Sequence, residues 1–259
     1  MSISNAGGAI LAKLVLAAAF SPCWGVAAAQ TSVGADAPPD VGDAPVDEGD
    51  RQIYANGALD QFEVGVGRDE EFRWEGEVWA GTFKHRLWLR SEGLINRDGD
   101  VHDGRLDVLY DHPISTFFNL QAGLRLDIDS HPGRTWAAFG VEGHVPYLFK
   151  GWATVYVSDE GRSALALRAS YDRLLSEHLI LQPEIKLNLY SEDDPARLIG
   201  SGLSDLSADL RLRYEITDRL APYVGVAYRR RFGDTAELTR AAGERADEAR
   251  VVIGIRSWF

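Results

Sequence analysis

Hydrophobic and polar residues alternate along most of this 259-residue chain, and the alternation is clearest at its end. The last residues place Arg256 on one side of an extended chain and an apolar set on the other, formed by Val251, Ile253, Ile255 and Phe259. A period of two residues is the period of a β-strand. One apolar and one charged face per strand is typical of a transmembrane β-barrel, whose wall faces lipid outside and a polar lumen inside.

The same period recurs upstream and predicts an all-β protein, a transmembrane antiparallel β-barrel of about twelve strands. The predicted strands lie near residues 60–67, 72–81, 85–94, 104–112, 117–128, 134–145, 150–158, 162–172, 178–190, 203–216, 219–231 and 248–259. Twelve is even, as bacterial barrels require. Ten strands, or eight with longer loops, remain open, because roughly 200 residues leave little beyond the about 9 to 11 that each crossing needs.

Two classes of connection alternate between these strands. Tight turns are predicted at 113–116, 146–149, 175–177 and 217–218, and longer polar loops at 95–103, 191–202 and 233–247. Outer-membrane barrels carry short turns on the periplasmic side and long loops outside the cell. The alternation is consistent when the first strand starts from the periplasm and the last strand returns there.

The two faces of each predicted strand differ in charge. The outward faces are uncharged and include Phe118, Leu120, Ala122, Leu124, Leu126, Ile128, Leu165, Leu167, Ala169, Tyr171, Leu179, Leu181, Ile185, Leu187, Leu189, Leu206, Ala208, Leu210, Leu212 and Tyr214. The inward faces carry both signs of charge, with Glu75, Glu77, Arg86, Arg90, Glu92, Arg105, Asp107, Asp111, Arg125, Asp127, Arg168, Asp172, Glu184, Lys186, Asp209, Arg211, Arg213, Glu215, Arg229 and Arg231.

A lumen of mixed sign favours ion pairs across the barrel, because unpaired charge away from water is costly. A wide general porin is therefore not expected. Two interpretations stay open. The interior is either a salt-bridged structure that only holds the wall together, or a selective conduit or binding cavity.

The first 58 residues do not follow the period of two. Residues 1–29 contain one charge, Lys13, then an apolar run and three alanines before Gln30, the pattern of a secretory signal peptide with its cleavage site. Residues 30–58 contain three prolines and six acidic residues against Arg51, so we expect a disordered acidic tail in the periplasm. The expected domains are the signal peptide (1–29), the tail (30–58) and an outer-membrane barrel (59–259).

Composition narrows the possible chemistry. Met1 and Cys23 are the only sulfur-containing residues, and both leave with the expected signal, so disulfides and thiolate or thioether metal sites are excluded from the mature chain. The chain holds 27 Lys and Arg against 39 Asp and Glu, a net charge of −12. This balance repels nucleic acid and favours cations or neutral molecules as partners, besides outer-membrane lipid. An ordinary solvated acidic surface would show the same balance.

Several stretches together resemble the copper resistance protein B family of outer-membrane proteins. They are HRLWLRSEG (85–93), NLQAGLRLD (119–127), RTWAAFGVEGHVPYLF (134–149), LILQPEIKLNLY (179–190), GSGLSDLSADLRLRYEI (200–216), APYVGV (221–226) and the final WF. The resemblance covers about residues 59–259. It implies an outer-membrane barrel that serves copper tolerance and homeostasis, by copper ion binding or handling rather than by catalysis.

The chain departs from this family ahead of the barrel. Family members often carry a Met- and His-rich segment there, whereas residues 30–58 contain neither Met nor His. Copper would then be bound by carboxylates or by histidines of the barrel. These donors suit copper(II) better than copper(I), so copper(II) is the expected ion.

Six histidines are the candidate nitrogen ligands, of which His102 and His131 fall in the outer loops. The other four adjoin predicted periplasmic turns and would share one rim; they are His85, His112, His144 and His178. The period of two directs His144, with Glu142, and His178 into the lumen, so this pair is the first candidate for a metal site. The alternative is that these histidines are unrelated interfacial residues on opposite walls.

An enzyme is not expected. Loop acids with His131, or Ser201, can be combined on paper, but their spacing is not typical of a nucleophile with its base. The expected function is an outer-membrane copper resistance protein that binds copper ions or passes them across the membrane. The alternative is a passive narrow channel or structural barrel without metal specificity. A periplasmic copper-handling protein is a further expected partner, with the acidic tail as its hypothetical contact.

Overall fold

The computed structural model describes residues 52–66, 71–97, 99–129, 133–145 and 149–259, which form a wall of strands with two short helices in its loops. The strands are β1 (Tyr54–Val66), β2 (Phe72–Gly81), β3 (Arg86–Ile95), β4 (Val101–Pro113), β5 (Phe118–Asp127), β6 (Thr135–Val145), β7 (Phe149–Ser158), β8 (Ser163–Tyr171), β9 (Arg173–Leu174), β10 (Leu179–Tyr190), β11 (Gly202–Tyr214), β12 (Leu220–Arg231) and β13 (Asp247–Trp258). The helices are η1 (Pro195–Arg197) and α2 (Gly233–Ala241). Neither these nor any other helix in the described ranges is long and apolar enough to cross a membrane.

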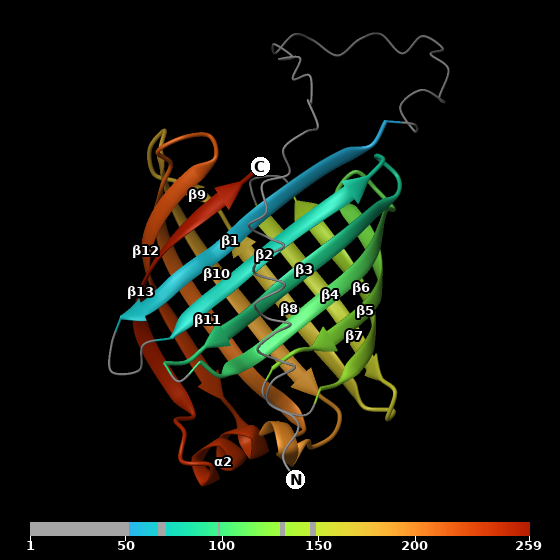
Figure 1. The fold of residues 1–259 in the computed structure, drawn as a ribbon, viewed down its shortest axis with the longest axis vertical. Coiled ribbons are helices and arrows are strands. Elements are labelled where there is room, and N and C mark those ends of the chain that lie inside the picture. The colour runs from blue at the N-terminus through green and yellow to red at the C-terminus, as the bar shows by residue number, and fades with distance from the viewer. Residues whose placement is uncertain (1–51, 67–70, 98, 130–132, 146–148) are drawn as a thin grey trace.

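The strands close into an antiparallel barrel (Figure 1). Strands pair with their neighbours in sequence, except that β8 and β9 both pair with β10, and the pairing of β1 with β13 closes the ring. The two residues of β9 continue β8 beyond Asp172, and both segments pair with β10 in the same register. The wall therefore has twelve strands, and the predicted fold class and strand number are confirmed.

The predicted strand ends agree with the structure to within a few residues, except at the start of β1. The prediction began the barrel at Leu59, whereas β1 begins at Tyr54 and pairs with β2 from there. After Tyr54, the first residues of β1 are small or polar and show no apolar period, but their backbone is paired, since Gly57 N donates to Phe259 O at 2.8 Å. Backbone pairing, which composition does not reveal, extends the barrel into the predicted tail. Residues 30–51 of that tail lie outside the described residues.

The two ends of the barrel differ as predicted. Short turns lie at the end that holds the C-terminus, and the longer loops, with η1 and α2, lie at the opposite end (Figure 1). The predicted turn at 146–149 falls mainly on residues 146–148, which are outside the described part of the chain. The end with short turns is the periplasmic end of an outer-membrane barrel.

Helix α2 (Gly233–Ala241) lies within the long polar loop predicted at 233–247. Asp234 in its first turn and Arg240 in its last turn complement the helix dipole. Its buried face carries Thr235, whose hydroxyl accepts a hydrogen bond from Gly200 N at 2.8 Å. A side chain at Gly200 would meet Thr235 N at 2.4 Å, so the glycine permits this close approach. The helix depends on contacts with another loop, which explains why periodicity missed it.

The two faces of the wall have the predicted polarity. Outward side chains such as Leu124 (53% exposed) and Ile253 (53%) are apolar, whereas the inward Gln121 is 2% exposed. Part of the lumen is filled by an inward cluster of large side chains, with Trp88, Trp136 and Tyr156 at its centre. The core of the protein therefore lies inside the barrel and not between layers.

We expect an arginine on the outward face to destabilise the barrel. Leu210 lies near the middle of β11 and is 46% exposed, so Leu210→Arg would place a charge in the hydrocarbon region. The expected loss is about 2 to 4 kcal/mol of unfolding free energy in phospholipid vesicles, measured by reversible denaturation. Ala241→Arg, an exposed position on α2, is the matched control and should change stability little. Equal losses in both variants would contradict the assigned membrane face.

Candidate conduit in the barrel lumen

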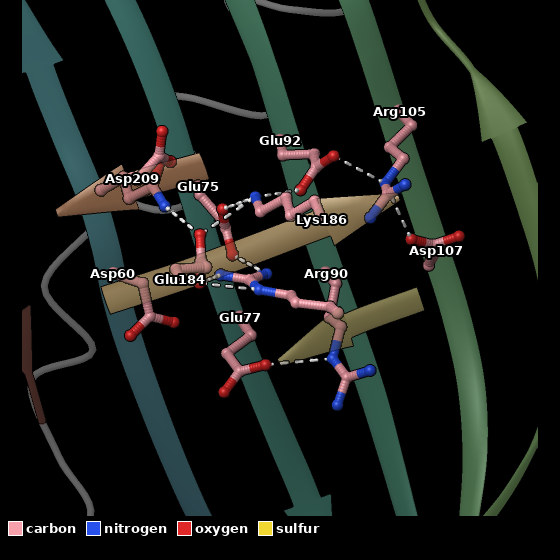
Figure 2. A network of polar contacts seen from close by, with 12 residues as sticks. Asp60, Glu75, Glu77, Arg90, Glu92, Arg105, Asp107, Glu184, Lys186 and Asp209 are labelled. Atoms are coloured by element: carbon pink, nitrogen blue, oxygen red, sulfur yellow. Dashed lines mark hydrogen bonds and ion pairs between the residues drawn. The ribbon is translucent and has the colours of Figure 1, made fainter. Parts of the chain in front are cut away.

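The lumen is crossed at mid-height by an ion pair from opposite walls. Glu75 lies on β2, and Arg168 lies on β8, six strands away around the ring of twelve. The Arg168 guanidinium contacts the Glu75 carboxylate, and its Nε and Nη2 donate to Glu184 Oε2 at 2.9 and 2.6 Å. Lys186 on β10 adds a second contact to Glu75 at 2.7 Å (Figure 2). We call Glu75, Arg168, Glu184 and Lys186 the central bridge.

A second group ties the central bridge to the wall that closes the barrel. Arg211 on β11 donates to both carboxylate oxygens of Glu63 on β1, at 3.0 and 3.1 Å, and to Asp209 at 3.0 Å. Tyr223 OH also donates to Glu63, at 2.9 Å. Arg211 is 2% exposed, so these are buried ion pairs, and Arg211 and Glu63 each have more than one partner.

A third group lies toward the periplasmic end and is centred on Arg90. Its guanidinium donates to Glu77 at 3.0 Å, to Gln121 at 3.1 Å and to Glu142 at 2.7 Å. It also lies over the ring of Trp88, 4.7 Å from the ring centroid. This arginine connects β2, β3, β5 and β6 and fills the lumen between the central bridge and the periplasm.

Two cavities lie along the lumen. The outer one, of about 490 Å³, opens between the long loops and is lined by paired charges that include Asp103, Asp129 and Arg229. The inner one, of about 70 Å³, lies against the central bridge and is lined by Glu77, Arg90 and Asp107 among others. Both cavities share Glu92 and Arg105, whose side chains form an ion pair at 3.1 Å. A single layer of ion pairs therefore separates the outer cavity from the inner one.

This arrangement favours small ions over neutral solutes. Arginine and lysine side chains occupy the carboxylates along the lumen, so a neutral solute would have to break ion pairs without replacing them. A cation can instead take the place of an arginine or lysine next to a carboxylate, which limits the cost of unpaired buried charge. The lumen can thus hold a cation or pass it stepwise, by exchange of ion-pair partners.

The predicted metal ligands divide between the two faces of the wall. Glu142 is inside the lumen and 2% exposed, bound by Arg90 and by Gln121 Nε2 at 2.6 Å. The backbone of His144 lies on β6 and pairs with Lys150, while the position of its side chain lies outside the described structure. Glu142 therefore belongs to the ion-pair group of Arg90.

Two of the predicted histidines lie together at the periplasmic end. The rings of His85 and His112 stack with centroids 5.4 Å apart, and His85 Nδ1 also contacts the hydroxyl of Tyr110. His112 Nδ1 lies 2.8 Å from the Lys84 carbonyl oxygen. Both residues continue the outward face that holds Leu87 and Tyr110, which are exposed. We call His85, Tyr110 and His112 the rim cluster, and it lies outside the lumen.

His178 is separate from the rim cluster. It precedes β10, on the opposite side of the ring from the start of β3. Its ring lies beside that of Tyr214, an exposed outward residue, with centroids 6.2 Å apart. The prediction that His178 points into the lumen is therefore wrong, because β10 begins only at Leu179 and the period of two does not extend into the turn.

The predicted gathering of four histidines is found in part, for His85 and His112. Parity along β3 and β4 could have placed both on the outer face, since they share it with Leu87 and Tyr110. No group of three or more His, Cys, Asp or Glu side chains is arranged to hold a metal ion within the described ranges. The charged residues of the central bridge were predicted as inward, but their pairing across the barrel was not.

Comparison with known proteins adds the family. Residues 53–259 match the sequence profile described as copper resistance protein B precursor (CopB). The chain is 42% identical over 186 residues to a copper resistance protein B homolog of Pseudomonas syringae pv. tomato, over 72% of this chain. It is 39% identical over 188 residues to copper resistance protein B of Escherichia coli, over 73% of this chain. The aligned part spans 63% of each of these two relatives.

A solved structure supports the fold. The barrel is similar to the NanC porin with a TM-score of 0.51 and 13% sequence identity, over 79% of this chain and 99% of that protein. At this identity the similarity concerns the fold alone. The closed wall with its apolar outer face and the profile match together make the chain an outer-membrane β-barrel. It belongs to the copper resistance protein B family.

Proposed function

We propose that this barrel acts in copper resistance at the outer membrane, by binding copper ions and passing them across. The family relationship supports copper as the ion. The observation that carries passage is the lumen, where two cavities share the Glu92–Arg105 ion pair and are lined by carboxylates and arginines. Copper is here the transported ion and not a resident cofactor.

The central bridge sets the condition for passage. Arg168 and Lys186 reach Glu75 from the opposite side of the barrel, so both must move for an ion to pass at this height. An incoming copper(II) ion replaces their charge next to Glu75 and Glu184, and the carboxylates are then never left unpaired. Neutral solutes lack this replacement, which makes the bridge a filter for charge as well as for size.

At the periplasmic end, we propose the rim cluster as a copper(II) contact. His85 and His112 are the two predicted ligands that the fold brings together, and imidazole nitrogen is a good donor for copper(II). Their Nδ1 atoms are engaged by Tyr110 and by the Lys84 carbonyl, which orients both rings. A periplasmic copper-handling protein is the expected partner at this end of the barrel.

Removal of the central arginine should open the lumen. Arg168→Met keeps the length of the side chain but removes the guanidinium that crosses the barrel. We expect the single-channel conductance in planar bilayers to rise several-fold over the native chain, and the preference for copper(II) in vesicle uptake to fall. The variant should also lose roughly 3 kcal/mol of unfolding free energy, because the carboxylates of Glu75 and Glu184 lose a buried partner. The double variant Arg168→Met with Glu184→Gln removes one charge of each sign and so keeps the net charge of the lumen.

The control for this variant is Arg240→Met, which removes an exposed arginine from α2 and should leave conductance unchanged. A steady open current in the native chain that is insensitive to copper would favour the passive channel or structural barrel instead.

Survival of cells with and without the barrel under copper, zinc and cobalt then tests which metal the protein serves. Equal protection against all three metals would contradict a copper-specific role.

Loss of the rim cluster should weaken copper(II) binding. We expect His85→Ala with His112→Ala to lower the affinity of the folded full chain for copper(II) about tenfold or more, because both imidazoles are removed. The affinity is measured by isothermal titration calorimetry with copper(II). His178→Ala removes an exposed histidine at the same end but on the opposite wall, and should leave the affinity unchanged. An unchanged affinity in the double variant would reject the rim cluster as a copper site.

A further inference from the structure

The inner cavity of the lumen is lined by charged groups of both signs. It is lined by the carboxylates of Asp60, Glu75, Glu77, Glu92 and Asp107, against the guanidinium groups of Arg90, Arg105 and Arg168. Its volume of about 70 Å³ has room for several water molecules, since each needs roughly 15 Å³. Arg256 and Lys186 pair with Asp60 and Glu75 from just outside the lining, so five basic side chains balance the five acidic ones.

Four of the five carboxylates already have close partners. Asp60 pairs with Arg256 at 2.8 Å, Glu77 with Arg90 at 3.0 Å and Glu92 with Arg105 at 3.1 Å. Glu75 belongs to the central bridge and binds Lys186 at 2.7 Å. These four are held in place by the wall and are available to a cation only through exchange of partners.

Asp107 differs from the other four. Its side chain on β4 is 3% exposed, and it pairs with Arg105, whose Nε lies 3.5 Å from Oδ2 (Figure 2). Its Oδ1 accepts no hydrogen bond from any residue in the described part of the chain. A buried carboxylate oxygen without a partner is costly, and a bound cation offsets that cost.

We propose that the inner cavity is an occluded binding site for a partly hydrated divalent cation, with Asp107 Oδ1 as its protein ligand. The oxygens of the other four carboxylates accept hydrogen bonds from its water shell. This agrees with the absence, among the described residues, of three carboxylates arranged for direct coordination. The central bridge and the Glu92–Arg105 pair close the site toward the outer cavity, and Arg90 closes it toward the periplasm.

The proposal deepens the proposed function, on which it rests for the identity of the ion as copper(II). The two proposed sites differ in donor chemistry, because the rim cluster offers nitrogen and the inner cavity offers only oxygen. Electron paramagnetic resonance of copper(II) separates them, since nitrogen ligands add superhyperfine splitting to the copper lines and oxygen ligands do not. The failure of one site can therefore be distinguished from the failure of the other.

The experiment adds copper(II) to the full chain folded in detergent micelles, in the background His85→Ala with His112→Ala. We expect one bound ion with an oxygen-only spectrum. Asp107→Asn should weaken this binding at least tenfold, whereas Asp172→Asn should not. Asp172 also faces the lumen and is bound by Gln182 at 2.7 Å and Arg213 at 3.1 Å, but it does not line the inner cavity.

A second variant tests the cavity without altering its charge. Ala166 lines the inner cavity, and Ala166→Leu would fill part of it. We expect Ala166→Leu to lose the oxygen-only ion as Asp107→Asn does. The heat-modifiable electrophoretic mobility of the variant should show that its barrel is still folded. Absence of an oxygen-only ion in the background chain, or its retention in either folded variant, would overturn the proposal. Loss of nitrogen-bound copper in the background chain bears on the rim cluster alone.

Discussion

The contact of Arg168 and Lys186 with Glu75 across the lumen is the constraint on which the other features depend. It joins β2 to β8 and β10, on opposite sides of the ring, and it divides the interior into an outer and an inner cavity. A wall of twelve strands leaves space that side chains must fill. Here long charged side chains fill it from both sides, so the same atoms hold the barrel in shape and obstruct its lumen.

Filling a barrel with charge is stable only when nearly every charge has a partner. Glu63 is bound by Arg211 and Tyr223, and Arg90 is bound by three side chains from three other strands. Removal of one member leaves another uncompensated in a region with little water, which costs far more than the pair contributes. In the proposed function, the interior resists neutral solutes, whereas an ion that supplies the same charge leaves no group unpaired.

The period of two in the sequence was sufficient for the wall, since each strand repeats apolar and polar positions independently of the others. It was insufficient for contacts that depend on how the strands assemble. Pro183 lies within β10, yet the register of β10 with β11 passes it unshifted, and the interruption appears on the neighbouring strand at Asp172. The partners of Arg168, the helix α2 and the position of His178 likewise depend on residues far away in sequence.

The wall separates two kinds of donor at the periplasmic end. Inside are carboxylates held by arginines, and outside are the imidazoles of His85 and His112. Carboxylate suits hard ions such as magnesium and calcium, whereas imidazole suits copper. In the proposed function, an ion in the lumen is thus bound by the weaker donors and reaches the stronger ones only beyond the barrel. Weak binding inside allows the ion to leave, and the arginines that return to the carboxylates close the path behind it.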